Sequence, residues 1–290
     1  MNKLLFLSAL FFAATLNTQA QDTPVIPDTL SGWGVIWEAE LNGSQASYSN
    51  WAQGGVNNIA ATGNSNFTAL YQQGRYSYAF TFNSRYGKSK VQDEGVRKTA
   101  DRLSIRNRLL YDLSDDNGDF KLFGNINLRT QFDEGFDYNA GPDGEDILIS
   151  RFMAPGYISE NAGLAYIPSD FFSFEAGLGM QQTIVRDESL SETYGLDPGD
   201  TFRNEAGFTF AAIYEQRVAE NLKLSSGVET FTNLNRPVSR TDFYFANELT
   251  GRINRLMSAS LRFDLAYDDD FSSEIQVAQI LSLGISFILL

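Results

Sequence analysis

Two residue types are missing from the chain, which has no cysteine and no histidine. Without cysteine there can be neither a disulfide-stabilised fold nor the lipid-modified N-terminal cysteine of a lipoprotein. Without histidine the chain lacks the commonest general base and a common metal ligand, which excludes Ser-His-Asp, Cys-His and histidine–zinc mechanisms. We therefore expect no enzyme of these classes, no cofactor and no metal site.

Positive charge and long apolar runs are also scarce. The chain has 22 Lys and Arg against 36 Asp and Glu, a formal net charge of −14. Nucleic acids are bound through clustered Lys and Arg, so we expect no nucleic-acid partner. Beyond residue 20, no apolar run approaches the roughly 18 residues of a membrane-spanning helix.

The first twenty residues are typical of a cleaved signal peptide. Lys3 supplies a positive charge, residues 4–14 form an apolar run, and Thr18 and Ala20 place small residues before the cut. Cleavage there would leave residues 21–290, with Gln21 first; losing the single charge of Lys3 changes −14 to −15. A buried N-terminal helix fits this order of features less well. We expect export across the inner membrane.

Alternation of apolar and polar residues is the clearest pattern in the rest of the chain. Leu281, Leu283, Ile285 and Phe287 alternate with serine or glycine, and other segments behave similarly. A period of two is typical of a strand with one apolar and one polar face. Twelve strands are predicted, at residues 35–47, 58–71, 75–88, 100–113, 119–133, 156–167, 171–185, 202–217, 221–234, 241–254, 256–268 and 278–290.

The predicted strands are long, and their connections are of two kinds. Most have 12 to 15 residues, against about five or six in globular proteins. Tight turns near 72–74, 114–118, 168–170 and 218–220 alternate with polar loops near 48–57, 89–99, 134–155, 186–201, 235–240 and 269–277. A secreted β-sandwich shares the alternation but has shorter strands. We predict an all-β, transmembrane antiparallel β-barrel of about 12 strands in the outer membrane of a Gram-negative bacterium.

Several short blocks resemble those of a Bacteroidota outer-membrane β-barrel family of unknown function. The most specific is Asn50-Trp51-Ala52-Gln53-Gly54-Gly55. The others are Arg97-Lys98-Thr99-Ala100-Asp101-Arg102, Thr130-Gln131-Phe132, Ala154-Pro155-Gly156-Tyr157 and Tyr267-Asp268-Asp269-Asp270. The resemblance extends over nearly the whole mature chain and implies an outer-membrane barrel. It brings no activity, substrate or catalytic residue.

Charged residues occupy the polar faces of the strands. A lipid-facing arginine costs about 2–4 kcal/mol at the membrane midplane, so we place these charges in the lumen. The cationic wall, on predicted strands three to five, comprises Arg85, Arg102, Arg106, Arg108, Lys121 and Arg129. The anionic wall, on strands seven to ten, comprises Glu175, Glu205, Glu215, Glu229 and Glu248, with Arg252 as an exception. The fourth and tenth strands of such a barrel are opposite, so the walls should face each other. The expected opposition is of Arg106, Arg108 and Arg129 to Glu205, Glu229 and Glu248.

Two functions are consistent with opposed charged walls. If the walls stay apart, the barrel is a narrow pore for small polar solutes, which is the function we favour. If they meet, ion pairs close the lumen and leave a non-conducting structural or accessory subunit of an outer-membrane complex. Carboxylate pairs such as Glu229 and Asp264 could support acid–base catalysis, but nothing distinguishes them from structural charges. We expect no enzyme.

The loops offer weaker candidate sites. Acidic residues near 133–146 and 268–270 could hold calcium, but they lack the EF-hand spacing. We favour solvated loops among lipopolysaccharide phosphates and their bridging cations. Trp51, beside Gly54 and Gly55, is interpreted as an interfacial anchor, with a partner contact as the alternative. The expected partners are outer-membrane lipid, lipopolysaccharide and other outer-membrane proteins.

Overall fold

A computed structural model describes residues 26–27, 29–47, 57–92, 94–114, 118–254, 256–268 and 272–288. The predicted signal peptide, residues 1–20, lies outside the described residues, as do Asn50, Trp51, Gly54 and Gly55 of the loop motif. Within the described ranges, no helix is long and apolar enough to cross a membrane.

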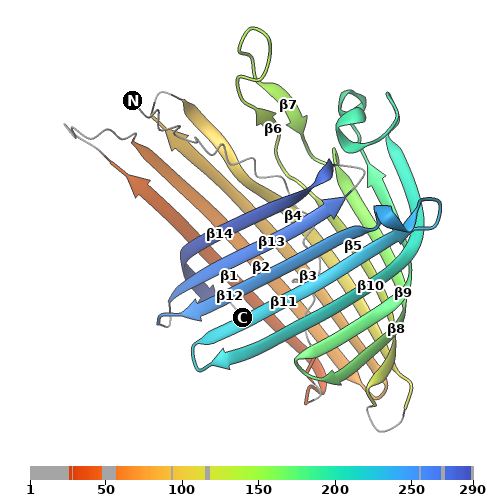
Figure 1. Ribbon diagram of the computed structural model, residues 1–290. Helices are drawn as coiled ribbons and strands as arrows, with labels where there is room; N and C mark the ends of the chain where they lie inside the picture. Colours follow the sequence, from red (N-terminus) through yellow and green to blue (C-terminus); the bar gives the residue numbers. More distant parts are fainter. Residues whose placement is uncertain are drawn as a thin grey trace, which may run out of the picture.

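Twelve long antiparallel strands close into a single barrel (Figure 1). In chain order they are β1 (Gly32–Ala46), β2 (Asn58–Gln73), β3 (Tyr76–Val91), β4 (Gly95–Asp112), β5 (Phe120–Thr130), β8 (Gly156–Ser169), β9 (Phe172–Ile184), β10 (Phe202–Ala219), β11 (Leu222–Asn233), β12 (Asp242–Arg252), β13 (Met257–Asp268) and β14 (Ser272–Ile288). Each pairs with its neighbours along the chain, except that β5 pairs with β8 and β14 closes the barrel on β1. The predicted twelve-stranded antiparallel barrel is confirmed.

Each predicted strand overlaps one strand of the barrel, but two predicted loops are wrong. Most of residues 89–99 is strand, because β3 continues to Val91 and β4 begins at Gly95. Most of residues 269–277 is also strand, because β14 begins at Ser272. The extensions of β3 and β4 are mostly polar, because backbone hydrogen bonds can continue a ladder where neither face needs to be apolar, whereas that of β14 carries the apolar Ile275 and Val277. The unpredicted hairpin of β6 (Gly135–Asp137) and β7 (Ile147–Ser150) lies within the loop that follows β5.

The two ends of the barrel differ. At the short-turn end lie the connections β2–β3, β4–β5, β8–β9, β10–β11 and β12–β13. The β2–β3 turn places Gly74 at φ +57°, a conformation in which glycine has no steric penalty. At the loop end, the β6–β7 hairpin and the segment between β9 and β10 project beyond the strands (Figure 1).

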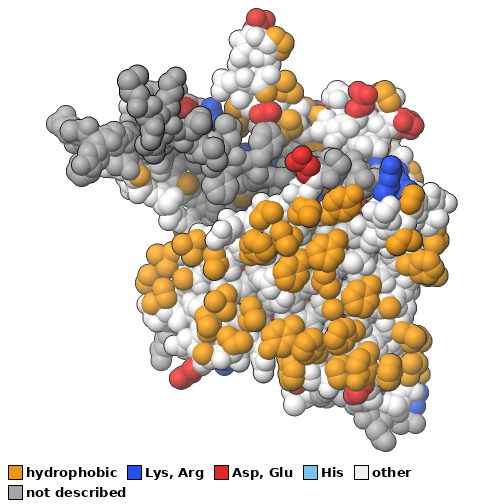
Figure 2. All heavy atoms as spheres, in the orientation of Figure 1, with side chains coloured by type: hydrophobic (Ala, Val, Ile, Leu, Met, Phe, Trp, Pro, Cys, Tyr) orange, Lys and Arg blue, Asp and Glu red, His pale blue; other side chains and the backbone are white. Residues whose placement is uncertain are grey.

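The outer surface of the barrel is apolar over much of its height. Figure 2 shows apolar side chains spread over the strands, with most charged groups toward the two ends. Leu178 is 58% exposed and Phe208 is 57% exposed, on adjacent strands. Aromatic rings form a girdle near the short-turn end, where Trp33 contacts Tyr71 at 4.9 Å between ring centroids. Monomeric soluble proteins rarely expose so large an apolar surface.

Candidate functional site

The charged side chains of the cationic wall point into the lumen. On β4, Arg108 is 3% exposed and Arg106 is 8% exposed, whereas Leu109, which follows Arg108, faces outward and is 48% exposed. Arg129 on β5 is likewise buried, at 6%. Arg102 also lies on the inner face of β4, where it is half-buried and directly opposite Arg85 of β3. The period of two therefore sets which face each charge occupies.

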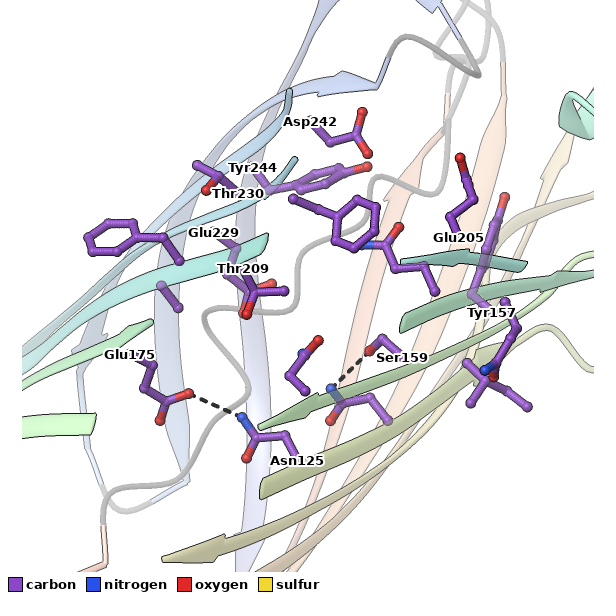
Figure 3. Close-up of a pocket in the computed structure, with 18 of the residues that line it drawn as sticks. Asn125, Tyr157, Ser159, Glu175, Glu205, Thr209, Glu229, Thr230, Asp242 and Tyr244 are labelled. Atoms are coloured by element: carbon purple, nitrogen blue, oxygen red, sulfur yellow. Dashed lines mark hydrogen bonds between the residues drawn. The ribbon is translucent and has the colours of Figure 1, made fainter. Parts of the chain in front are cut away.

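A buried ion pair spans part of the lumen, nearer the short-turn end than the loop end. The Arg108 guanidinium donates a hydrogen bond to the Glu175 carboxylate, and their side chains are 4% and 6% exposed. Arg108 also donates to the Ser173 hydroxyl at 3.3 Å. The second Glu175 oxygen accepts a hydrogen bond from the Asn125 amide at 3.1 Å (Figure 3). This network joins β4, β5 and β9.

The partner of Arg108 corrects the predicted geometry. We expected Arg108 to face Glu205, Glu229 or Glu248, but its carboxylate partner is Glu175. In the barrel order β4–β5–β8–β9, Glu175 lies on the third neighbour of β4. The pair therefore spans a sector of the lumen and leaves the opposite wall to other residues.

The predicted anionic wall contains cations of its own, which is a second correction. Glu205 accepts from Arg203 at 3.1 Å, and Glu248 lies 3.9 Å from Arg262. Arg262 also binds Asp264 at 2.8 Å. Arg203 and Glu205, like Arg262 and Asp264, are two residues apart and so share a strand face. This spacing was visible in the sequence and could have revealed both pairs.

Two cavities lie in the lumen, one on each side of the Arg108–Glu175 pair. The outer cavity, toward the loop end, has about 90 Å³ open to the centres of water molecules, and Glu175 lines it. The inner cavity, toward the short-turn end, has about 100 Å³, and Arg108 lines it. Each of these volumes is several times the roughly 10–15 Å³ that one water molecule needs. The ion pair is therefore a constriction between two spaces that can each hold several waters.

The outer cavity carries hydrogen-bonding groups of both charges. Its charged lining residues are Arg106, Arg203, Glu205, Glu229, Asp242 and Asp268. Tyr244 donates a hydrogen bond to Asp268 at 2.8 Å, and Figure 3 shows Tyr244, Asp242 and Glu229 converging on the same space. The Arg129 guanidinium lies over the Tyr157 ring, 4.5 Å from its centroid, a cation–π contact. Such a lining suits polar or zwitterionic molecules better than apolar ones.

The inner cavity has an apolar closure at the short-turn end. Leu110, Phe123 and Ala165 form a buried cluster, against which Ile167 and Ile26 pack. Ile26 precedes β1 and lines the cavity. The contact between Ile26 and this cluster was not predicted from the sequence. Its signal was present, because Leu110, Phe123 and Ala165 stand on strand faces that otherwise carry polar residues.

Two of the resembling sequence blocks meet at the loop end. The Lys98 ammonium, in block 97–102, donates to Asp101 at 2.8 Å and to Gln131, in block 130–132, at 3.1 Å. Asp101 accepts from the backbone N–H groups of Phe132 and Asp133, each at 2.9 Å. These hydrogen bonds hold the loop that follows β5 against the loop end of β4.

The acidic loop residues are held by specific donors. The pKa of Asp133 is below its usual value, chiefly because the Tyr86 hydroxyl and then the Glu134 N–H donate to its carboxylate. The pKa of Asp187 is also lowered, first by the Ser189 hydroxyl and then by Arg151. Asp133 lies in the loop where calcium was the weaker alternative, and in this structure its contacts are protein donors.

Part of the chain matches a family without an assigned activity. Residues 44–136, about a third of the chain, match a family described as "Protein of unknown function (DUF3078)". The matched region contains blocks 50–55, 97–102 and 130–132 and excludes the blocks nearer the C-terminus. No curated protein matches the chain. The Bacteroidota origin stays a prediction.

Solved structures resemble the barrel at low sequence identity. The translocator domain of autotransporter NalP from Neisseria meningitidis is 12% identical, with 90% of each chain covered and a TM-score of 0.43. The NanC porin is 8% identical, with 87% of this chain and 97% of that chain covered and a TM-score of 0.38. The CymD monoaromatic hydrocarbon channel is 12% identical, with 88% and 87% covered and a TM-score of 0.35. Similarity this low bears on neither solute nor partner.

Proposed function

We propose that this chain is an integral outer-membrane barrel that forms a narrow pore for small polar solutes. An apolar outer surface with an aromatic girdle suits hydrocarbon bounded by headgroups. Closure of the strands into a barrel pairs most of their backbone groups, as the hydrocarbon of a bilayer requires. The short-turn end would face the periplasm and the loop end the exterior. Outer-membrane lipid and lipopolysaccharide would then be the surrounding partners, and no catalytic role is included.

The observation that carries the pore is the pair of lumen cavities separated by one ion pair. The smallest barrels fill their interior with side chains, whereas wide porins leave an aqueous channel. Here the outer and inner cavities occupy the lumen on both sides of Arg108 and Glu175. A path through the barrel therefore requires movement of few side chains.

The chemistry of the constriction favours a zwitterionic solute. Two unit charges about 4 Å apart attract by roughly 4 kcal/mol at an effective dielectric near 20. Separating Arg108 from Glu175 would lose this attraction. A solute that carries both charges can offset the loss, since its anionic group can bind Arg108 while its cationic group binds Glu175. Arg106 and Glu229, which line the same outer cavity, would orient such a solute before it reaches the pair.

Single-channel recording in planar bilayers tests this proposal. The wild type should conduct weakly. Arg106→Gln removes a lumen cation, so the reversal potential in a salt gradient should shift toward cation preference. Ile105→Leu, next to it on the apolar face, is the matched control and should leave selectivity unchanged.

The second candidate is a non-conducting accessory subunit of an outer-membrane complex. The burial of the Arg108–Glu175 pair favours it, because a buried pair can close a lumen permanently. A folded wild-type barrel that passes no current, with elution at the size of a larger assembly, would replace the pore with this function.

A further inference from the structure

The barrel closes through a seam between β1 and β14 that is shorter than any other strand contact in it. Within the described part of the chain, five residue pairs form the seam, from Glu38↔Ile288 to Asn42↔Gly284. Every other neighbouring pair in the barrel has at least ten. Among the described residues, 43–46 of β1 and 272–283 of β14 do not pair with each other, and the two strands diverge toward the loop end (Figure 1).

The unpaired part of β14 lies within the apolar surface. Its outward side chains are mostly apolar, with Ile275 69%, Val277 61% and Leu283 57% exposed, and Gln279 is a polar exception. In hydrocarbon, each backbone group without a partner costs several kcal/mol. An edge at this depth is therefore stable only when it pairs further with β1 or when another molecule supplies polar groups to it.

Glu40 lies in the middle of the paired part of the seam, opposite Ser286. Its carboxylate accepts from the Asn64 amide of β2 at 3.2 Å and from the Ser258 hydroxyl of β13 at 3.4 Å. The carboxylate lies where a side chain at Gly284 would be, so any larger residue there would have to displace it. Among the described residues, the seam is thus held by five backbone pairs and by the Glu40 carboxylate. Toward the loop end, beyond the pair Asn42↔Gly284, β1 and β14 are not paired with each other.

A cationic group lies on the inner face of β3, two strands along from β1. Arg85 lies in the row Glu40↔Asn64↔Arg85 on the inner face. Its opposite neighbour on β4 is Arg102, and like charges directly opposite on adjacent strands are destabilising. The Arg85 Nε is buried and has no hydrogen-bond partner among the described residues.

Arg85 has both cations and carboxylates around it. Arg262 and Arg102 are the cations nearest to it electrostatically, and Glu248 and Glu40 are the nearest carboxylates. Glu40 is held by Asn64 and Ser258, and Glu248 lies near Arg262. An anion beside Arg85 and Arg102 would relieve the repulsion between them.

We propose that the seam admits an anionic amphiphile from the membrane into the lumen. Its alkyl chain would lie between the diverging edges of β1 and β14, and its phosphate or carboxylate head would bind Arg85 and Arg102. This inference rests on the membrane-spanning barrel of the proposed function and is independent of its conductance. It adds a lateral route to the axial one.

The absence of cysteine from the chain allows a direct test of the seam. Leu41 pairs with Ile285, so Gly43 and Leu283 are the next outward positions in that register. A Cβ at Gly43 would have its nearest neighbour at 3.8 Å. The variant Gly43→Cys/Leu283→Cys should therefore form a disulfide that locks the seam closed.

Binding of dodecyl phosphate in a neutral detergent, measured by calorimetry, is the readout. We expect the reduced variant to bind like wild type and the oxidised one at least tenfold more weakly, with recovery on reduction. Leu178→Cys/Phe208→Cys, which joins paired outward positions of β9 and β10, is the control and should bind equally in both states. Equal binding by the oxidised and reduced seam variant, or failure of its thiols to cross-link, would overturn the lateral route.

The head group is tested on the same assay. Arg85→Gln should weaken dodecyl phosphate binding at least tenfold, and Arg85→Lys should restore most of it. Inorganic phosphate should bind far more weakly than dodecyl phosphate, and dodecyltrimethylammonium should not bind. Unchanged affinity in Arg85→Gln, with folding verified by heat-dependent gel migration, would refute this site. Conductance of the same variants is recorded separately, so loss of the pore and loss of the amphiphile site are distinguishable.

Discussion

Replacing Glu175 with alanine should destabilise the barrel by several kcal/mol. The change leaves the Arg108 guanidinium, whose side chain is 4% exposed, with the Ser173 hydroxyl at 3.3 Å as its remaining described partner. It also removes the acceptor of the Asn125 amide. Two hydrogen bonds to a charged group, at about 1.5–3 kcal/mol each, give a loss of roughly 3–6 kcal/mol. Loss of one partner of a buried pair costs about 3–5 kcal/mol, so the two estimates agree.

A double variant separates the pair itself from the unpaired charge. Arg108→Met/Glu175→Leu removes both charges and fills their space with apolar atoms. Such replacements of buried ion pairs are often neutral or stabilising. We therefore expect the double variant to lie within about 1 kcal/mol of wild type, well above the single variant.

Urea unfolding in phospholipid vesicles, followed by the difference in gel migration between folded and unfolded protein, measures both free energies. A loss below about 1 kcal/mol in Glu175→Ala would show that water reaches Arg108 and screens its charge. The lumen would then be continuous across the pair, and the constriction in the proposed pore would be absent.

Three further predictions follow from location, strand face and loop charge. Cell fractionation should recover the protein in the outer membrane, and unheated samples should migrate faster than boiled ones on an SDS gel; recovery from the soluble periplasm would contradict the barrel's location. Leu178→Arg, at a 58% exposed outward position, should cost about 2–4 kcal/mol in vesicles, whereas Gln181→Arg, which lines the outer cavity, should cost much less; equal losses would refute the assigned faces. Because the pKa of Asp133 is lowered, its stabilisation of the loop should be complete above the unfolded value of about 3.9 and lost as pH falls through the lower folded value. In NMR titrations of the Glu134 amide, which donates to the Asp133 carboxylate at 2.9 Å, Tyr86→Phe should move this loss to higher pH, and an unchanged midpoint would exclude the Tyr86 hydroxyl as the main cause.

The strands could be predicted from the sequence because a single physical requirement repeats along each of them. Leu281, Leu283, Ile285 and Phe287 are 80%, 57%, 45% and 46% exposed on the outer surface, as their alternation with serine and glycine predicts. The pattern fails where both faces of a strand are polar. That is why 89–91 and 95–99 were interpreted as loop although they continue β3 and β4.

The candidate site was less predictable than the fold. Alternation assigns a side chain to the inner face, but its height in the lumen depends on the stagger of neighbouring strands. Opposition of the fourth and tenth strands was therefore too coarse to find the Arg108–Glu175 pair, which joins the fourth and seventh. The Arg203–Glu205 pair is different, because it lies within one strand and needs no knowledge of stagger.

The apolar closure at the short-turn end yields a prediction that locates the main barrier of the pore. Ile26 packs against Leu110, Phe123 and Ala165, so Ile26→Ser should weaken this contact while the ladders of the barrel, which do not include residue 26, remain intact. The Ile26 contact and the Arg108–Glu175 pair would be two constrictions in series. Their electrical resistances add, so the larger resistance determines most of the conductance. If the apolar contact is the larger, Ile26→Ser should raise single-channel conductance more than Glu175→Ala does. If both matter, the variant with both changes should conduct more than either alone. An unchanged conductance in Ile26→Ser, beside an increase in Glu175→Ala, would assign the barrier to the ion pair and leave Ile26 a packing role only.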